Sequence, residues 1–278
     1  MKREIELKGR LRSLQALGEA IGAMKSLSAH HLREARNAVQ PARGYRDGVA
    51  HILERAGATF TAGERGGGLL VIGAELGLCG GYNAQLVELG ARHRAKLGDG
   101  PTLCVGHRAA ILLGRRNVDV DRAYGGPTSV HGITALLLKL AEDMLTAYAT
   151  KRLSSFDIVS SRFAGVGKAS PASVRLLPVE AKGSAVARRP RYVEPDHFVS
   201  VVVREYLYIT LFDLLLDALA SEHGARLAAT QNAETWLDKR TERLRRYLMA
   251  TRREASTQEM IEIAAGARAI QGSGPAAI

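Results

Sequence analysis

The sequence has few aromatic residues, only two cysteines and no long uninterrupted apolar segment. Phe, Trp and Tyr make up 5% of the 278 residues, which argues against a surface that stacks on nucleic-acid bases. Two cysteines cannot form a disulfide framework, and we interpret Cys79 and Cys104 as reduced, buried thiols. The most apolar segment, residues 209–220, contains Asp213 and Asp217 and is too short to span a bilayer. We therefore expect neither a disulfide-rich secreted fold nor a membrane span.

Hydrophobic residues make up 46% of the chain and charged residues 24%, which is typical of a globular protein. The net charge of +11 is unevenly distributed. Residues 239–253 hold one acid, Glu242, and seven basic residues, namely Lys239, Arg240, Arg243, Arg245, Arg246, Arg252 and Arg253. A second, acid-free group comprises Lys182, Arg188, Arg189 and Arg191. Such charge predicts an acidic partner, which is a nucleic acid, an anionic lipid or an acidic protein surface.

Two long helices are predicted at the ends of the chain. In residues 2–55, apolar or small residues recur every seven positions, as Leu7, Leu14, Ile21, Ser28 and Ala35. Pro41 and Gly44 are the strong helix breakers there, and we expect a kink. Residues 198–270 lack proline and carry a second apolar stripe, made of Leu207, Leu211, Leu214, Ala218, Ala225 and Ala228. A lone helix cannot bury such a stripe, so we expect the two helices to pair, with the C-terminal one extending further.

The middle of the chain alternates short apolar runs with helical patterns. We predict strands at 69–72, 102–105, 118–124, 156–163 and 174–179, and helices at 83–97, 107–115 and 129–150. This alternation indicates a mostly parallel sheet covered by helices. The expected fold class is α/β plus a long antiparallel coiled coil, with the N- and C-terminal helices paired and a Rossmann-like α/β domain inserted between them. The expected divisions are a coiled-coil helix (1–57), the α/β domain (66–180), a basic loop (181–196), a second coiled-coil helix (197–270) and a flexible tail (271–278).

Two glycine-containing segments are candidates for phosphate binding. Residues 77–83 (GLCGGYN) follow a predicted strand and precede a helix, but their spacing is G-x-x-G-G and they lack the lysine of a P-loop. We interpret Gly77, Gly80 and Gly81 as parts of a structural turn that lets helix and sheet pack closely. Residues 165–168 (GVGK) fail as a P-loop, because position 162 is an arginine and Ala169 follows the lysine.

The eight histidines form no recognisable set of metal ligands. His30 and His31 are adjacent, so on a helix they are expected to point in different directions. The H-E-x-x-H and C-x-x-C motifs are absent. We therefore predict no catalytic residue, no cofactor and no metal. Three hypotheses remain open: a non-catalytic rod with a basic face, a basic coiled-coil protein that binds nucleic acid, and an α/β enzyme that binds a nucleotide at residues 77–83.

Several motifs resemble the gamma subunit of F-type ATP synthase. Residues 77–83 are similar to that family's G-L-C-G-G-[LF]-N, and residues 221–226 (SEHGAR) resemble its S-E-x-x-A-R. Residues 252–267 resemble its ending, R-Q-A-x-I-T-Q-E-L-x-E-I-x-x-G-A, and near the start residues 13–15 (SLQ) and 23–24 (AM) resemble its S-[VI]-x and K-A-M. The resemblance extends over the whole chain and is strongest in the glycine motif and the C-terminal segment.

The resemblance implies a non-catalytic rotor shaft that couples ion translocation to conformational change in the catalytic beta subunits. The implied partners are an alpha3beta3 hexamer, the epsilon subunit and the membrane c-ring, with one copy of this chain per complex and no cofactor or nucleic acid. The absence of a transit peptide and of a two-cysteine regulatory insert favours a bacterial origin. The expected location is the cytoplasmic side of the bacterial inner (plasma) membrane, to which the protein is held peripherally through the complex.

The resemblance also implies contacts between rotor and stator at the positions that match the family's motifs. These are Met24, Lys25, Glu222, Arg226, Arg252, Arg253, Thr257 and Glu259. The sequence departs from the family's pattern at several of these positions and near them. Lys25 replaces an acidic residue, Arg253 a glutamine and Ser256 an isoleucine, while Glu75 and Leu76 replace Asp-Arg. We therefore expect a divergent gamma subunit, and an alternative, sodium-type bacterial ATPase stays open as its source.

Overall fold

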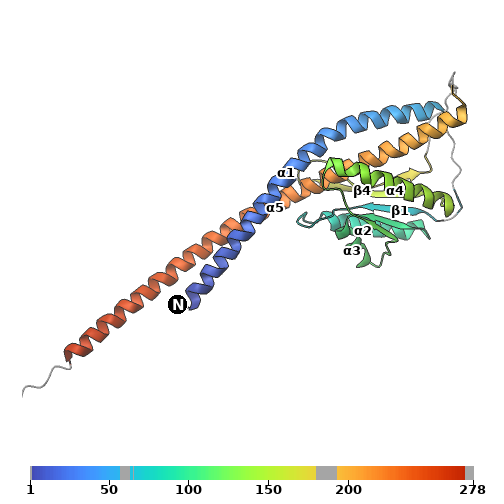
Figure 1. The fold of residues 1–278 in the computed structure, drawn as a ribbon. Helices are drawn as coiled ribbons and strands as arrows, with labels where there is room; N and C mark the ends of the chain where they lie inside the picture. Colours follow the sequence, from blue (N-terminus) through green and yellow to red (C-terminus); the bar gives the residue numbers. More distant parts are fainter. Residues whose placement is uncertain (1, 57–62, 65, 180–192, 273–278) are drawn as a thin grey trace, which may run out of the picture. The chain divides into compact units, whose positions relative to one another are not determined.

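The computed structural model describes residues 2–56, 63–64, 66–179 and 193–272. The chain begins and ends with long helices, α1 (Lys2–Ala56) and α5 (Pro195–Gly272) (Figure 1). Between them follow β1 (Gly68–Ile72), α2 (Tyr82–Leu97), β2 (Thr102–Val105), α3 (His107–Gly114), β3 (Arg122–Tyr124), α4 (Val130–Thr150), β4 (Phe156–Phe163) and β5 (Ala169–Leu177). The predicted terminal helices and α/β core are confirmed, and α1 continues through Pro41 without a break.

The chain forms two compact units. One comprises residues 1–24 and 231–278, and the other comprises residues 25–230. Both α1 and α5 contribute to each unit, so each unit contains a stretch of both terminal helices.

A five-stranded sheet forms the centre of the larger unit, in the order β3-β2-β1-β4-β5. The first four strands are parallel, and β5 pairs with β4 antiparallel. The order 3-2-1-4 is that of half a Rossmann fold, as predicted. The strand predicted at 118–124 covers only Arg122–Tyr124 in the structure. Val118 is instead buried in the turn that follows α3, where its N–H donates to the Leu113 carbonyl.

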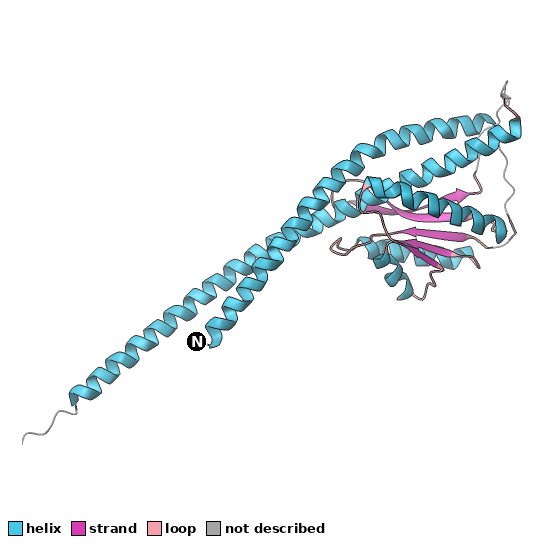
Figure 2. Ribbon diagram, viewed as in Figure 1, coloured by secondary structure: helices cyan, strands magenta, loops and turns pink. Residues whose placement is uncertain are grey.

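Helices cover both faces of the sheet (Figure 2). On one face, α4 and the neighbouring parts of α1 and α5 form a core with residues such as Leu70, Phe156 and Leu215. On the other face, α2 and α3 form a second core with residues such as Leu86 and Leu113. The strands β1, β2 and the start of β4 are therefore buried on both sides, which explains their nearly continuous apolar sequence.

Buried ion pairs join α1 to α5 in the larger unit. Asp217 of α5 accepts from Arg43 of α1 at 2.7 Å and from Arg162 of β4 at 3.3 Å. Asp213, one turn earlier, pairs with Arg46. Both aspartate side chains are fully buried, so these arginines supply the charge and hydrogen bonds that burial requires. Since the higher number on α1 pairs with the lower one on α5, the helices run antiparallel, as predicted.

The smaller unit is a second antiparallel stretch of the same two helices. Arg3 donates to the Tyr247 hydroxyl, and Glu4 pairs with Arg252 at 2.9 Å. The side chains buried in this unit are Leu7, Ile21, Leu237 and Leu248. Beyond Arg252, every described side chain of α5 up to residue 268 is exposed, so the described part of the chain does not cover this last part of the helix.

Two sequence predictions concern residues outside the described part of the chain. The basic loop predicted at 181–196 falls mostly on residues 180–192, and the tail predicted at 271–278 falls mostly on residues 273–278. Within the described residues, no helix combines the length and apolar character that crossing a membrane requires.

We expect Asp217→Ala to destabilise the larger unit by about 2–3 kcal/mol, because it leaves Arg43 and Arg162 without their shared counter-charge. The cost is below that of breaking a fully enclosed pair, since these arginine side chains are 30% and 36% exposed. Urea unfolding followed by circular dichroism measures the change. The control Glu242→Gln removes an exposed partner of Arg246 and should cost less than about 1 kcal/mol. Equal stability of the Asp217 variant and the wild type would contradict the assignment.

Candidate functional site

The candidate site is the edge of the sheet where β1 and β4 end. In open α/β sheets with this strand order, ligands bind in the crevice outside the carboxyl ends of the two strands at the switch point. Here α5 occupies that place. Ser221 of α5 donates to the Ser161 carbonyl of β4, and Arg226 donates to the Gly77 carbonyl in the loop after β1. The chain therefore fills with its own helix the position where a dinucleotide would bind.

The glycine turn at residues 77–83 packs against α5. The Tyr82 hydroxyl donates to the Ala218 carbonyl, and Asn83 accepts the Ala74 N–H at 2.9 Å, which ties the turn to the end of β1. Gly80 has φ +57°, and its Cα faces Ala229 of α5. Of the three glycines predicted to form the turn (Gly77, Gly80 and Gly81), Gly80 is thus the one with the left-handed backbone conformation that favours glycine. Leu78 also has positive φ, which is unusual for a residue with a side chain.

Glu222 and Arg226 form a buried ion pair beneath this turn. Their side chains are 10% and 2% exposed and lie 2.5 Å apart. Arg226 also donates to the Leu76 and Gly77 carbonyls, so one guanidinium joins α5 to the loop after β1. Burial raises the pKa of Glu222, although Arg226 opposes that shift. These two residues, which the sequence predicts as partner contacts, bind within their own chain.

Glu75 lies in the same loop after β1 and joins it to two neighbouring segments. Its carboxylate accepts from the N–H groups of Gly126 and His107 and from the His107 ring. Burial acts to raise the pKa of Glu75, but these donors outweigh it, and the pKa lies below its usual value. Glu75 thereby caps the start of α3 and joins three loops at this edge.

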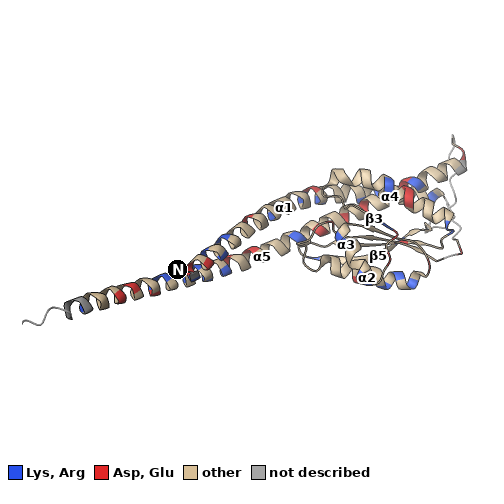
Figure 3. Cartoon of the chain, turned by 60° about the horizontal axis from the view of Figure 1, so that its bottom comes forward, with Lys and Arg blue, Asp and Glu red and all other residues tan. Residues whose placement is uncertain are grey.

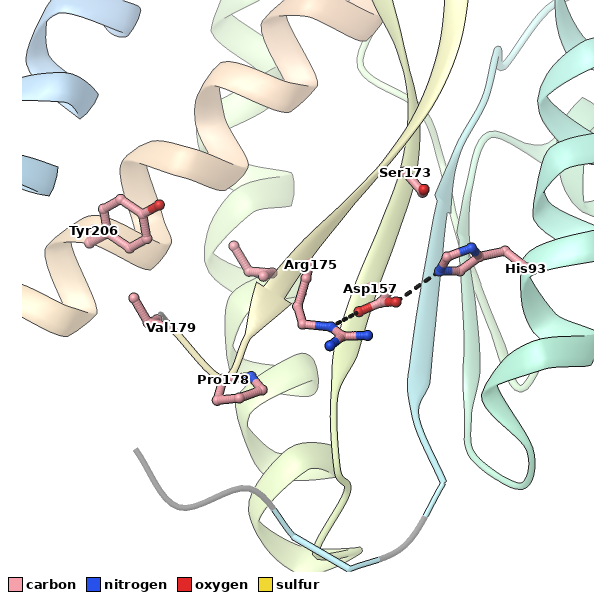
Figure 4. A pocket seen from close by; sticks show the side chains of 8 residues that line it. His93, Asp157, Ser173, Arg175, Pro178, Val179 and Tyr206 are labelled. Carbon is pink, nitrogen blue, oxygen red and sulfur yellow. Dashed lines mark hydrogen bonds and ion pairs between the residues drawn. The ribbon is translucent and has the colours of Figure 1, made fainter. Parts of the chain in front are cut away.

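The structure also brings together three charged or polar residues that no sequence motif indicates, namely His93, Asp157 and Arg175. A cavity of about 440 Å³ is lined in part by the buried Asp157 of β4, which pairs with His93 of α2 at 2.8 Å and with Arg175 of β5 at 3.1 Å (Figure 4). Ser173 lines the same cavity, but no hydrogen bond is found between it and His93 in the described chain. The pairing neutralises a buried aspartate. Because these residues are far apart in sequence, only the sheet register reveals them.

The remaining predicted contact residues lie on the terminal helices. Met24 and Lys25 are half-buried on α1. Arg252, Arg253, Thr257 and Glu259 are exposed on α5, where the Thr257 hydroxyl donates back to the Arg253 carbonyl. Figure 3 shows charges of both signs along this part of the helix. Of the eight predicted contact residues, Glu222 and Arg226 are therefore buried, whereas the other six are half-buried or exposed.

The GVGK segment at residues 165–168 forms the turn of the β4–β5 hairpin. Lys168 N–H donates to the Gly165 carbonyl, and Gly167 has φ +72° and donates to the Gly224 carbonyl of α5. The segment precedes a strand and not a helix, so it cannot act as a P-loop.

Comparison with known proteins identifies the class to which this architecture belongs. The family model described as "ATP synthase" matches residues 4–270. The chain belongs to this family, and its relatives are ATP synthase gamma chains. It is 30% identical to the gamma chain of Moorella thermoacetica over 96% of this chain and 98% of that one. It is 28% identical to that of Desulforamulus reducens over the same shares.

The fold is also that of solved ATP synthase chains. A chain in the cryo-EM structure of Euglena gracilis mitochondrial ATP synthase (OSCP/F1/c-ring, rotational state 3) superimposes with a TM-score of 0.71. The match covers 100% of this chain and 97% of that chain at 14% identity. The gamma subunit is a non-catalytic component of the central stalk in the F1 part of a membrane-associated complex, and catalysis occurs on the beta subunits. The nucleic-acid hypothesis finds no support in these comparisons.

We expect Arg226→Met to destabilise the larger unit by about 3 kcal/mol, because Glu222 keeps a buried charge without its counter-ion. Adding Glu222→Gln should recover part of that loss, so the double variant should cost less than the sum of the single ones. Urea unfolding gives the energies, and hydrogen exchange at residues 76–83 should accelerate in the single variant. The matched control is Arg246→Met, which breaks an exposed pair with the same i,i+4 spacing. Additive costs would contradict direct coupling.

The lowered pKa of Glu75 predicts a pH dependence of stability. The unfolded chain binds the proton more tightly, so Glu75 stabilises the fold above about pH 4.5, and this contribution is lost as pH falls through the folded-state pKa. Glu75→Gln should cost about 1–2 kcal/mol at pH 7 and less at pH 4. Urea unfolding at both pH values tests this, with Glu142→Gln on the exposed side of α4 as control. A gap between wild type and variant that is constant with pH would refute the role of the ionised carboxylate.

Proposed function

We propose that the chain is the rotor shaft of an F-type ATP synthase and that the last part of α5 enters an alpha3beta3 hexamer. The observation that supports this most directly is the exposure of α5 beyond Arg252. Met260, Ile261 and Ile263 are 63%, 58% and 72% exposed, on a part of the helix that no other described residue of the chain covers. Clustered exposed apolar side chains mark a surface that a partner covers.

The proposed contacts with the hexamer are the six predicted residues that have surface to offer. Four of them lie on the exposed last part of α5, which starts at Arg252; they are Arg252, Arg253, Thr257 and Glu259. The other two, Met24 and Lys25, lie on α1. Glu222 and Arg226 are not in this set, because they are buried, pair with each other and hold the loop that contains the glycine turn.

The basic run at residues 239–253 favours an acidic surface on the beta subunits. Within the described residues, Arg246 of the run pairs with Glu242, and Arg252 pairs with Glu4 of α1. Individual exposed pairs contribute about 0–1 kcal/mol, so the run acts as a group of many weak attractions. An attraction of this kind is compatible with a shaft that must move past successive beta subunits and not bind permanently to one.

The proposed coupling depends on the shaft making different contacts with each of the three catalytic subunits. A shaft without threefold symmetry presents a different face to each of three identical catalytic subunits. Its contacts then favour a different conformation in each subunit, because a binding partner shifts populations by its differential affinity for the states. The reacting nucleotide lies on the beta subunits, and the residues of this chain act only through these contacts.

The α/β domain is proposed to contact the epsilon subunit and the c-ring, through which ion flow turns the shaft. The corresponding location is the cytoplasmic side of the bacterial plasma membrane, with one copy of the chain in each complex. Bacterial relatives such as the Moorella thermoacetica protein support this assignment.

We expect the double substitution of Met260 and Ile263 by serine to weaken association with the alpha and beta subunits at least tenfold. Each buried apolar side chain contributes about 1.5–3 kcal/mol to the interface, whereas the stability of the isolated chain should not change because both side chains are exposed in it. Co-purification of the co-expressed subunits and ATP synthesis by membrane vesicles measure the effect. Ile111→Ser, at an exposed position of α3, serves as control. Unchanged association and ATP synthesis in the double variant would contradict the proposal.

A further inference from the structure

A cluster of potential metal ligands lies on α1, away from the glycine turn. His30, His31 and Glu34 each offer one ligand atom, and these three atoms lie within 4.8 Å of one another. His31 Nδ1 is 3.0 Å from Glu34 Oε2, and His30 Nε2 is 3.7 Å from the same oxygen. The three side chains are 60%, 16% and 35% exposed, so a cation from solvent can reach them.

The helix explains why the adjacent histidines converge. Glu34 is four residues after His30 and three after His31, and both spacings place side chains on neighbouring positions of one face. Adjacent histidines point in different directions on a helix, but here the Glu34 carboxylate one turn later lies within reach of both. The pattern H-H-x-x-E is the signal in the sequence that indicates it.

A buried histidine of α5 lies beside this cluster. His223 is 5% exposed, and its ring centroid lies 5.1 Å from that of His31. Its Nδ1 accepts a hydrogen bond from Arg226 at 3.3 Å, which places the proton of the neutral ring on Nε2, and the Thr128 backbone lies near the ring. A nitrogen that carries a proton cannot coordinate a cation, so His223 borders the cluster and is not one of its ligands.

We propose that His30, His31 and Glu34 bind a divalent transition-metal cation of the Zn²⁺ type, with water completing its coordination. Two imidazole nitrogens and one carboxylate oxygen are a ligand set that Zn²⁺ accepts. Ligand atoms on a tetrahedral Zn²⁺ lie about 3.3 Å apart, which is between the two distances measured to Glu34. Small rotations of exposed side chains are enough to complete the geometry.

The position of the ligands defines what kind of site this is. All three come from one turn of a continuous helix, so the cation does not connect separate elements and is not required for folding. The site is exchangeable and partly open to solvent, unlike closed structural zinc sites with four protein ligands.

The test uses the full chain without a histidine tag, titrated with Co²⁺ as a spectroscopic probe and then with Zn²⁺. We expect one Co²⁺ per chain, displaced by one equivalent of Zn²⁺. The double variant His30→Ala, His31→Ala should lose this binding, and Glu34→Gln should weaken it at least tenfold. Saturating Zn²⁺ should raise the melting temperature of the wild type and not that of the double variant. Circular dichroism verifies that the variants retain their helices.

The matched control is the double variant His51→Ala, Glu54→Gln, which removes a histidine and a glutamate from another exposed site on α1. It should bind Co²⁺ like the wild type. The proposal is overturned if the wild type binds no metal, if binding persists in the variants of His30, His31 and Glu34, or if the control loses it equally. A thiolate-to-cobalt charge-transfer band would assign binding to a cysteine and would also overturn it.

Discussion

The ionisable residues on the buried face of α5 constrain the whole larger unit. A helix that buries Asp213, Asp217, Glu222 and Arg226 can pack only where each charge meets a partner, because an unpaired charge in the interior costs several kcal/mol. The aspartates determine which turn of α1 lies opposite α5. Arg226 determines where the loop after β1 docks. The same set of pairs therefore aligns the two helices and attaches the sheet to them.

This arrangement explains why an α/β fold carries no chemistry here. The crevice at the ends of β1 and β4, which binds ligands in related sheets, is filled by α5. The glycine turn that would otherwise approach a phosphate approaches a helix backbone. The end of the sheet and the loop after β1 thus bind α5 and hold it in place. In the smaller unit, α5 continues past its ion pair with Glu4 of α1, and the apolar side chains beyond that pair are exposed.

Polar clusters elsewhere in the domain differ in their exposure, and this difference separates structural from ligand-binding groups. Asp157 is buried and neutralised by His93 and Arg175, so its hydrogen bonds are already used. Glu34 is partly exposed between two imidazoles, 3.0 Å from His31 Nδ1 and 3.7 Å from His30 Nε2. A cation can replace weak contacts at the second cluster, whereas at the first it would have to break a buried pair.

The sequence by itself determined the helices, most strands and the family, because these depend on local periodicity and on short motifs. The apolar stripes predict α1 and α5, and the glycine motif and the C-terminal motif indicate the family. Only the tertiary structure decided that Glu222 and Arg226 bind inward, that Val118 lies in a turn, and that β5 runs antiparallel. Those outcomes depend on contacts between residues far apart in the chain, and a pattern of neighbouring residues contains no information about which distant group will meet a buried charge.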